Sequence, residues 1–276
     1  MNHQAHVPVE AEAARKDYLW PQISGLPYFR GLLRAVEARF YENIELPSPT
    51  LDLGCGDGHF ASLAFERPLE VGLDPWEGPL KEAEKRAAYL KTVHAPGDKI
   101  PFENGFFASA VSNSVLEHIP ELDPVLSELA RVMKPGAPFV FCVPNHNFLD
   151  SLSISNFLDR IGLRALSNSY RRFFNRIARH HHCDDPLIWQ ARLDRAGFEL
   201  QHWWHYFSPR ALRVLEWGHY FGLPSLVSRK LFGKWILATT RWNLLFTELI
   251  TRSIYNEPSN QPQGTCTFYI ARRKTE

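Results

Sequence analysis

The residues of this chain best suited to bind a small molecule are the glycines of the turn 54–58, whose sequence is GCGDG. The apolar run 50–53 precedes the turn and the apolar segment 59–65 follows it, as expected for a strand that passes into a helix. Glycine lets the backbone approach a ligand closely, and the first turn of a helix offers unpaired N–H groups and a positive dipole end. The turn therefore predicts a binding site for a cofactor tail.

A carboxylate follows at the place where such a cofactor would carry its ribose. Asp74 ends the next apolar run, sixteen residues after Gly58, and a carboxylate there can accept hydrogen bonds from both ribose hydroxyls. Trp76, just beyond Pro75, could pack against the sugar or the adenine. The dinucleotide fingerprint G-x-G-x-x-G needs glycine where this chain has His59. An NAD(P)-dependent oxidoreductase is therefore disfavoured. The alternative to a cofactor site is a glycine turn that serves only tight packing.

Short apolar runs alternate with segments of helical periodicity in the first half of the chain. The runs are TLDLG, LEVGLD, ASAVSNS and FVFCVPN. Segments 79–91 and 121–133 lie between them and repeat their apolar residues at helical spacing. This alternation is typical of βαβ units and predicts a parallel sheet with right-handed crossovers.

The remaining segments predict how the chain is organised. Residues 1–48 are expected to form a tail and a helix, and residues 49–276 one domain. That domain has two predicted insertions, a basic and aromatic segment at 146–186 and an apolar and basic segment at 208–262. A helix and a strand are expected between the insertions, and a last strand after the second. The first helix is predicted from four apolar residues at helical spacing: Leu32, Leu33, Val36 and Phe40.

Five ordered motifs carry a resemblance to a known family. They are LDLGCGDG, VGLDPW, IPFENGFF, SNSVLEHI and ELARVMKPGAPFVFCVPN, which together span about residues 49–145. The chain resembles the class I S-adenosylmethionine-dependent methyltransferases of the type 11 group. The resemblance implies an α/β fold, a Rossmann-like doubly wound sheet of seven strands. That sheet is mostly parallel, with an antiparallel C-terminal strand and helical insertions.

The resemblance also implies a set of cofactor contacts. Asn113 and Ser114 would lie beside the sulfonium of S-adenosylmethionine, and Asp98 would replace the acidic residue that meets the adenine, because the aligned position holds Pro96. Ala108 and Ala137 depart from the usual Asp and Gly. The other implied cofactor-binding residues surround the methionine part or the ribose: Asp52, Gly54, Cys55, Gly56, Gly58, Asp74, Pro75 and Trp76.

The residues that act on the acceptor are predicted less directly. The sulfonium already activates the methyl group, so positioning in a dry site can supply most of the catalysis and a general base is optional. His118 is the first candidate base, with local packing or capping as its structural alternative. The resemblance suggests that the segment RHHHCDD covers the acceptor, and His181 within it is the second candidate. Adjacent residues rarely point at one centre, so no metal site is predicted there.

Composition limits the partners and the compartment. From His146 onward there are 18 Lys and Arg against 10 Asp and Glu, which leaves 13 against 20 before it, and six of the eight tryptophans lie in the basic part. Such a surface suits a small-molecule or lipid-like acceptor or peripheral membrane contact, or it is a solvated basic face over an aromatic core. The apolar helices of 208–262 are expected mainly to pack on the core. No nucleic-acid recognition motif is present, which disfavours that partner.

Cysteine spacing and the lack of targeting segments bear on the compartment. The four cysteines are widely spaced and form no CxxC pair, which favours a reducing cytoplasm. No signal peptide and no run of 18 apolar residues is apparent. A cofactor-free binding protein on the same fold is the alternative to an active methyltransferase, and the intact glycines argue against it.

Overall fold

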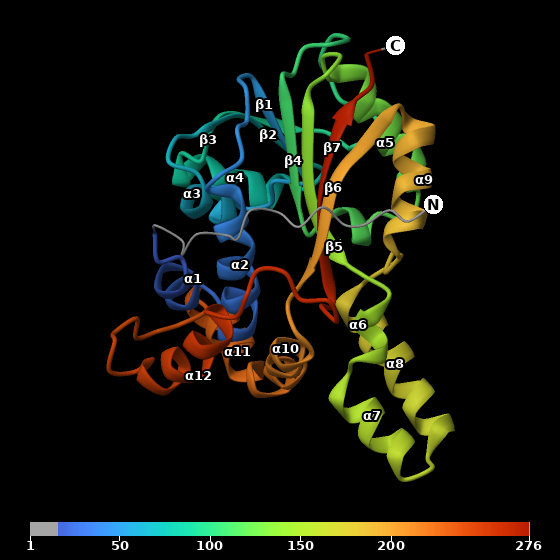
Figure 1. Cartoon of the computed structure of the whole chain (residues 1–276). Coiled ribbons are helices and arrows are strands. Elements are labelled where there is room, and N and C mark those ends of the chain that lie inside the picture. The colour runs from blue at the N-terminus through green and yellow to red at the C-terminus, as the bar shows by residue number, and fades with distance from the viewer. Residues whose placement is uncertain (1–15, 276) are drawn as a thin grey trace.

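The computed structural model describes residues 16–275, so the predicted tail of residues 1–15 lies outside the described part. A mixed sheet of seven strands forms the centre (Figure 1). Its strands are β1 (Thr50–Leu53), β2 (Leu69–Asp74), β3 (Tyr89–His94), β4 (Ser109–Asn113), β5 (Pro138–Pro144), β6 (Phe198–Tyr206) and β7 (Cys266–Arg273).

Helices surround the sheet and extend beyond one end of it. In chain order they are α1 (Leu19–Gly25), α2 (Tyr28–Tyr41), α3 (His59–Ala64), α4 (Glu77–Arg86), the 3₁₀ helix η1 (Leu116–His118), α5 (Leu122–Val132), α6 (Asn147–Asp150), α7 (Ser153–Arg160), α8 (Arg164–Ala178), α9 (Pro186–Ala196), α10 (Pro209–Phe221), α11 (Leu223–Phe232) and α12 (Leu245–Tyr255).

The order of the strands is β3-β2-β1-β4-β5-β7-β6. The pairs from β3 to β5 are parallel, whereas β7 is antiparallel to both of its neighbours. This confirms the predicted mostly parallel sheet with an antiparallel C-terminal strand. Strands β2 and β3 lie on one side of β1, and β4 and β5 lie on the other, so the strand order reverses between β1 and β4. In open α/β sheets a ligand binds in the crevice outside the strand ends at such a point.

One predicted helix ends earlier than its periodicity indicates. The pattern in 79–91 predicts helix throughout, but α4 ends at Arg86 and Tyr89 begins β3. Ala87 adopts a left-handed conformation with φ 51° and so ends the helix. The apolar residues after Ala87 belong to β3, which pairs with β2, and do not continue the helix.

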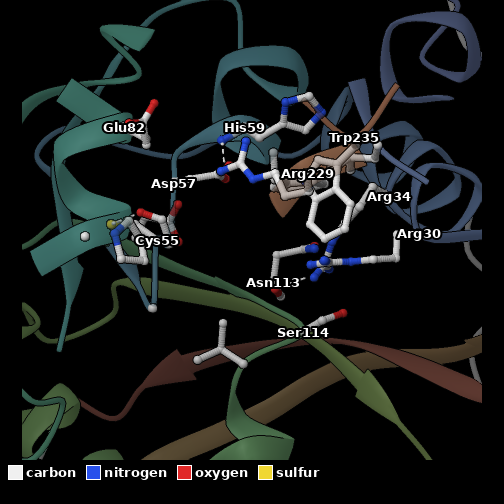
Figure 2. Close-up of a pocket in the computed structure, with 18 residues that line it drawn as sticks. Arg30, Arg34, Cys55, Asp57, His59, Glu82, Asn113, Ser114, Arg229 and Trp235 are labelled. Atoms are coloured by element: carbon white, nitrogen blue, oxygen red, sulfur yellow. Dashed lines mark hydrogen bonds between the residues drawn. The ribbon is translucent and has the colours of Figure 1, made fainter. Parts of the chain in front are cut away.

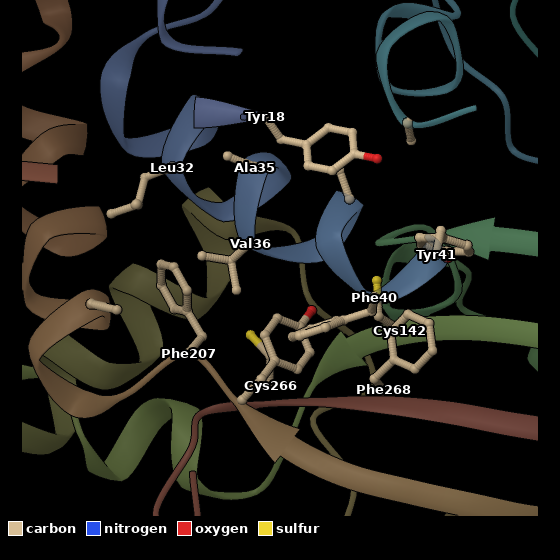
Figure 3. Close-up of a cluster of buried hydrophobic side chains, with 14 of the residues drawn as sticks. Tyr18, Leu32, Ala35, Val36, Phe40, Tyr41, Cys142, Phe207, Cys266 and Phe268 are labelled. Carbon is tan, nitrogen blue, oxygen red and sulfur yellow. The ribbon is translucent and has the colours of Figure 1, made fainter. Parts of the chain in front are cut away.

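The two faces of the sheet carry separate cores because alternate residues of each strand point in opposite directions. In β5, Phe139 and Phe141 join the core under α5 and α9, whereas Val140 and Cys142 join the core under α1 and α2. The second of these cores is rich in aromatic rings (Figure 3). Helix α2 is therefore fixed tightly against the sheet, and its polar residues are held in defined places.

The two segments predicted as insertions are largely helical. Residues 146–186 contain α6, α7 and α8, and residues 208–262 contain α10, α11 and α12. Both groups extend past the end of the sheet at which β5 ends (Figure 1). Between residues 16 and 275, none of the helices has both the length and the apolar composition required to cross a bilayer.

Candidate functional site

The glycine turn joins β1 to α3 in the strand-to-helix geometry that the sequence predicts. Gly54, Gly56 and Gly58 all have positive φ, at 80°, 55° and 68°. A Cβ on Gly56 would meet nothing within 4 Å, so its backbone faces open space. A Cβ on Gly58 would instead lie 3.1 Å from the Cβ atoms of Ala83 and Ala88. Gly56 is thus the glycine that a ligand can approach, and Gly58 lets the turn pack against α4.

Asp74 is tied to this turn by its side chain. Its two carboxylate oxygens accept hydrogen bonds from the backbone N–H groups of Gly56 and Trp76, each at 2.9 Å. Burial raises the pKa of this carboxyl group, and the two N–H donors oppose the rise. Because each carboxylate oxygen can accept two hydrogen bonds, both retain an acceptor position. Asp74 therefore holds the turn in place and keeps capacity for further donors.

A cavity of about 490 Å³ lies next to the turn, over the carboxyl ends of β1 and β4 (Figure 2). This volume is within the usual range for small-ligand sites, about 300–1,000 Å³. The lining residues include six of the predicted cofactor contacts: Asp52, Gly54, Cys55, Gly56, Asn113 and Ser114. The remaining lining residues come from the turn itself, the residue after Ser114 and the helical segments around the turn: Leu26, Arg30, Arg34, Asp57, His59, Phe60, Gly78, Pro79, Glu82, Val115, Arg229 and Trp235.

The other predicted cofactor contacts lie outside the cavity lining. Gly58 packs the turn against α4, and the Asp74 carboxylate binds the Gly56 N–H. Pro75 and Trp76 follow β2 and are exposed, Trp76 to 71%. Asp98 is exposed in the loop after β3. The structure thus brings six of the predicted contacts together around one cavity, and all of the predicted cofactor contacts stay predictions.

Helix α2 supplies a part of the site that the sequence reasoning missed. The buried carboxylate of Glu37 accepts hydrogen bonds through Oε2 from Asn113 Nδ2 at 2.6 Å and Arg34 Nη1 at 2.8 Å. Its Oε1 accepts from Ser114 Oγ at 3.0 Å and Tyr206 OH at 2.8 Å. Four donors thus surround a carboxylate with no exposed surface. Glu37 fixes three residues that line the cavity.

The positions of these polar residues on α2 could have revealed them. Arg30, Arg34 and Glu37 recur at spacings of four and three, the spacing of one helical face, beside the apolar stripe that predicts the helix. Helical spacing places these three residues on one face but does not say which segment that face meets. A search restricted to the strand ends and the glycine turn does not find them.

Charges of both signs face the cavity. Burial alone would lower the pKa of Arg34, but the Glu37 carboxylate outweighs it and holds that pKa above its usual value. Burial raises the pKa of Asp52 to about 7, and the hydrogen bond from Tyr89 OH at 2.6 Å opposes the rise. Arg34 therefore stays charged on the α2 side of the cavity while paired with Glu37, and a guanidinium there suits an anionic ligand group.

A cluster of titratable groups lies just beyond Ser114. Glu117 is buried, and its Oε2 has no hydrogen-bond partner within the described residues. Its Oε1 lies 3.7 Å from Nε2 of His118, whose Nδ1 lies 3.0 Å from the carbonyl oxygen of Arg179. The carbonyl can only accept, so Nδ1 carries the proton and Nε2 is the free base. Burial raises the pKa of Glu117 to about 8 and lowers that of His118.

The segment after α8 completes this cluster. The His180 ring lies 5.5 Å from the His118 ring, centroid to centroid, and burial lowers the pKa of His180 to about 3. Glu117, His118 and His180 each place one ligand atom within 4.8 Å of the others, so they are residues that could hold a metal ion. His181, the predicted second base, donates its backbone N–H to the Glu117 carbonyl at 2.7 Å, and its side chain is exposed.

The second helical group also contributes to the cavity. Arg229 of α11 and Trp235, which follows α11, belong to its lining (Figure 2). The guanidinium carbons of Arg30 and Arg229 lie 5.9 Å and 5.8 Å from the centre of the Trp235 ring, a distance at which cations and aromatic rings attract. This contact joins α2 to residues 222–244 above the site.

Comparisons with known proteins agree with this arrangement. The methyltransferase domain family matches residues 51–141. A malonyl-[acyl-carrier protein] O-methyltransferase of Legionella pneumophila is 30% identical over 118 residues, which are 39% of this chain and 42% of that protein. A demethylmenaquinone methyltransferase of Streptomyces avermitilis is 32% identical over 119 residues, 42% of this chain and 48% of that protein. The chain thus spans less than half the length of these curated relatives.

A solved structure extends the likeness to the whole fold. A SAM-dependent methyltransferase from Thermotoga maritima superposes with a TM-score of 0.54 at 13% identity, covering 90% of this chain and 91% of that one. At this identity the likeness establishes the fold alone.

Proposed function

We propose that this chain, whose residues 51–141 belong to the type 11 group of class I methyltransferases, transfers a methyl group from S-adenosylmethionine to a small-molecule or lipid-like acceptor. The observation that carries the proposal is the open backbone of Gly56 beside a cavity at the carboxyl ends of β1 and β4. That is where the order of the strands reverses, and where α/β sheets bind their ligands.

The residues around the cavity fit the charged end of the cofactor. S-adenosylmethionine, when bound, supplies a methyl group on a positively charged sulfur next to an amino acid end with one carboxylate. The guanidinium groups of Arg30 and Arg34 suit that carboxylate. Asn113 and Ser114, fixed by Glu37, would border the sulfonium. The amide of Asn113 and the hydroxyl of Ser114 are neutral, so they place no second positive charge beside the sulfonium.

The nucleoside end would lie over β2 and β3. The acceptor positions that remain on Asp74 suit the two ribose hydroxyls, and the exposed ring of Trp76 suits the sugar or the adenine. Asp98 would accept from the adenine amino group. These contacts require the nucleoside to extend from the cavity along the outer side of the glycine turn.

The acceptor would approach from the side of Glu117 and His118. His118 presents an unprotonated Nε2 at neutral pH, because its Nδ1 proton is held by the Arg179 carbonyl and burial lowers its pKa. For an oxygen acceptor this nitrogen can take the proton that the acceptor loses. His181 is a second candidate, on a segment whose backbone is bound to Glu117.

Two calorimetric titrations test the first step, with S-adenosylmethionine and with its demethylated product. The expected result is micromolar binding of both, abolished by Asp74→Ala and by Gly54→Val. No heat and no thermal stabilisation with either ligand would favour the cofactor-free binding protein. Saturable enhancement of NADH fluorescence would favour an oxidoreductase instead.

Transfer itself is tested with S-adenosylmethionine that carries a labelled methyl group. The protein is incubated with a lysate separated into lipid, small-molecule, protein and nucleic-acid pools. Label is expected in the lipid or small-molecule pool. Label confined to protein or nucleic acid would overturn the proposed acceptor class and keep the methyl transfer.

A further inference from the structure

Exposed apolar side chains are concentrated in the helices around 217–250. The described residues expose 24 large hydrophobic side chains, and 13 of them lie between Trp217 and Ile250. Trp242 and Phe246 are exposed to 88% and 77%. The sequence predicts that the helices of 208–262 pack mainly on the core, which holds for Leu212, Leu215 and Leu244 but not for the 13. A concentration of exposed apolar side chains in one stretch of chain points to an interaction site.

Helix α11 shows the pattern in its simplest form. It has no buried residue, although five of its ten residues are Leu, Val or Phe. Leu223, Leu226, Val227 and Leu231 recur at helical spacing, so they share one face, and all four are exposed. A helix with an unpartnered apolar face and a polar remainder is typical of segments that lie in the membrane interface.

The charges of the same segment select the partner. The only acidic residue from 217 to 250 is Glu248, which is paired with Arg252 at 2.6 Å, whereas Arg229, Lys230, Lys234 and Arg241 all lie there. Exposed apolar rings among cations match the boundary of an anionic bilayer, where the rings enter the acyl region and the cations meet the phosphates.

A second helical element has the same composition. The hairpin of α7 and α8 exposes six large hydrophobic side chains between Phe157 and Ile177. Six arginines occur between residues 153 and 179, against a single acidic residue, Asp159. Asp159 is paired with Arg171 at 2.8 Å, which leaves the other five arginines in excess. The hairpin and α10–α12 both extend past the end of the sheet that carries the cavity (Figure 1).

We propose that residues 217–250, assisted by the α7–α8 hairpin, form a docking surface for anionic phospholipid bilayers, and that the acceptor is an amphipathic lipid drawn from the bound leaflet. The second part rests on the proposed function. Arg229 and Trp235 belong to this surface and also line the cavity. A lipid head group can therefore reach the cavity while its chains stay among the exposed apolar residues.

Vesicle co-sedimentation of the full chain tests the docking surface without any need for methyl transfer. The probes are vesicles of phosphatidylcholine alone and of phosphatidylcholine mixed with phosphatidylglycerol. The wild-type protein is expected to bind the mixed vesicles at least about tenfold more strongly, because each cation near an anionic surface strengthens binding. Equal or undetectable binding to the two kinds of vesicle would overturn the proposal.

Two double variants assign the binding to residues 217–250. Trp242→Ser with Phe246→Ser should lower the partition coefficient about tenfold or more. The matched control is Leu90→Ser with Leu187→Ser, whose side chains are 73% and 74% exposed outside the surface, and it should bind as the wild type does. Lys230→Glu with Lys234→Glu should remove the preference for phosphatidylglycerol, whereas Lys99→Glu with Lys134→Glu, which changes the charge equally, should keep it.

The outcomes separate this inference from the proposed function. Calorimetric binding of S-adenosylmethionine should be the same in all four double variants. Vesicle binding without cofactor binding would reject the proposed function and leave the docking surface in place. Cofactor binding without vesicle binding would reject the surface. Sedimentation velocity that shows a dimer lost in the Trp242→Ser, Phe246→Ser variant, together with no vesicle binding, would identify a second copy of the chain as the partner.

Discussion

Asn113 at the end of β4 donates a hydrogen bond of 2.6 Å from Nδ2 to the buried Glu37 carboxylate of α2, 76 residues earlier in the chain. Through this contact an N-terminal helix sets the orientation of a side chain at the centre of the site. The same carboxylate also orders Ser114 and Arg34. The floor of the cavity is thus held by one buried anion rather than by the strand ends alone.

Replacing this anion should weaken both the fold and the site. In Glu37→Gln, one carboxylate oxygen becomes an amide nitrogen that faces two donors. We expect the free energy of unfolding to fall by about 3 kcal/mol, as when one partner of a buried charge pair is removed, and cofactor affinity to fall with it. Urea unfolding and calorimetry measure the two effects. Glu45→Gln, at an exposed position, is the control, and equal stability of the two variants would contradict the role of Glu37.

The glycine turn offers a test in which crowding and ligand access are separable. A Cβ on Gly54 would lie 2.3 Å from Cγ1 of Val115, whereas Gly56 has open space. Gly54→Ala should therefore cost about 2 to 4 kcal/mol of stability through overpacking and a left-handed alanine. The double variant Gly54→Ala, Val115→Ala should be more stable than the sum of the two single changes in free energy of unfolding predicts.

Gly56→Ala should behave in the opposite way. It should lose only about 1 to 2 kcal/mol, the usual cost of a left-handed alanine, but at least tenfold in affinity for S-adenosylmethionine, because the new methyl group enters the space that the ligand needs. Thermal unfolding and calorimetry of the same preparations give both numbers. Unchanged cofactor affinity in Gly56→Ala would show that the ligand does not lie against this residue.

His118 is expected to act on the acceptor and not on the cofactor. For an oxygen acceptor, His118→Ala should lower kcat about 10²- to 10⁴-fold, the usual contribution of a general base, with the Kd for S-adenosylmethionine unchanged. Since burial lowers the pKa of His118, the acid-side decline of wild-type kcat/KM should have its midpoint below that of an ordinary histidine. His202→Ala, an exposed histidine on β6, is the control. A pH profile that is the same with and without His118 would exclude it as the base.

Glu117 should make stability depend on pH. Its pKa is about 8 in the folded protein because of burial, against a usual 4.5, so the folded state binds more protons between these values. Stability from this group is complete below about pH 4.5 and is lost as the pH rises to about 8, with a slope of at most about 1.4 kcal/mol per pH unit. Urea unfolding between pH 5 and 8 should show the decline, and Glu117→Gln should flatten it.

Methyl transfer should persist after divalent ions are removed. The methyl group is activated by its own sulfonium, so no Lewis acid is needed for the transfer. Activity after dialysis against EDTA is therefore expected to equal that before it. The alternative outcome is a loss of activity that Zn²⁺ or Mg²⁺ restores in the wild-type protein but not in His180→Ala. That outcome would identify Glu117, His118 and His180 as a metal site.

The features that the sequence could predict are those that depend on short stretches of chain. The strand runs, the glycine turn and the last strand depend on local patterns, and each appears where it was predicted. The family resemblance implies Asn113 and Ser114, and both line the cavity. The C-terminal limit of α4 was missed because a residue in the left-handed conformation, Ala87, carries no signal as glycine would.

The unpredicted features depend on contacts between distant segments. Glu37 becomes part of the site only because α2 packs on the sheet and brings it to Tyr206, 169 residues away. Arg229 and Trp235 reach the cavity by way of an insertion whose path no periodicity describes. His118 meets His180 for the same reason. Tertiary packing decides these contacts, and local sequence patterns do not contain it.

The position of β7 has a consequence for how the chain is made. Residues 266–273 are the last part of the sheet to be synthesised, yet they lie between β5 and β6. Until they emerge from the ribosome, β5 and β6 each carry an unpaired edge that can pair with other chains. Insertion of the last strand therefore completes the fold and removes an aggregation hazard in the same event.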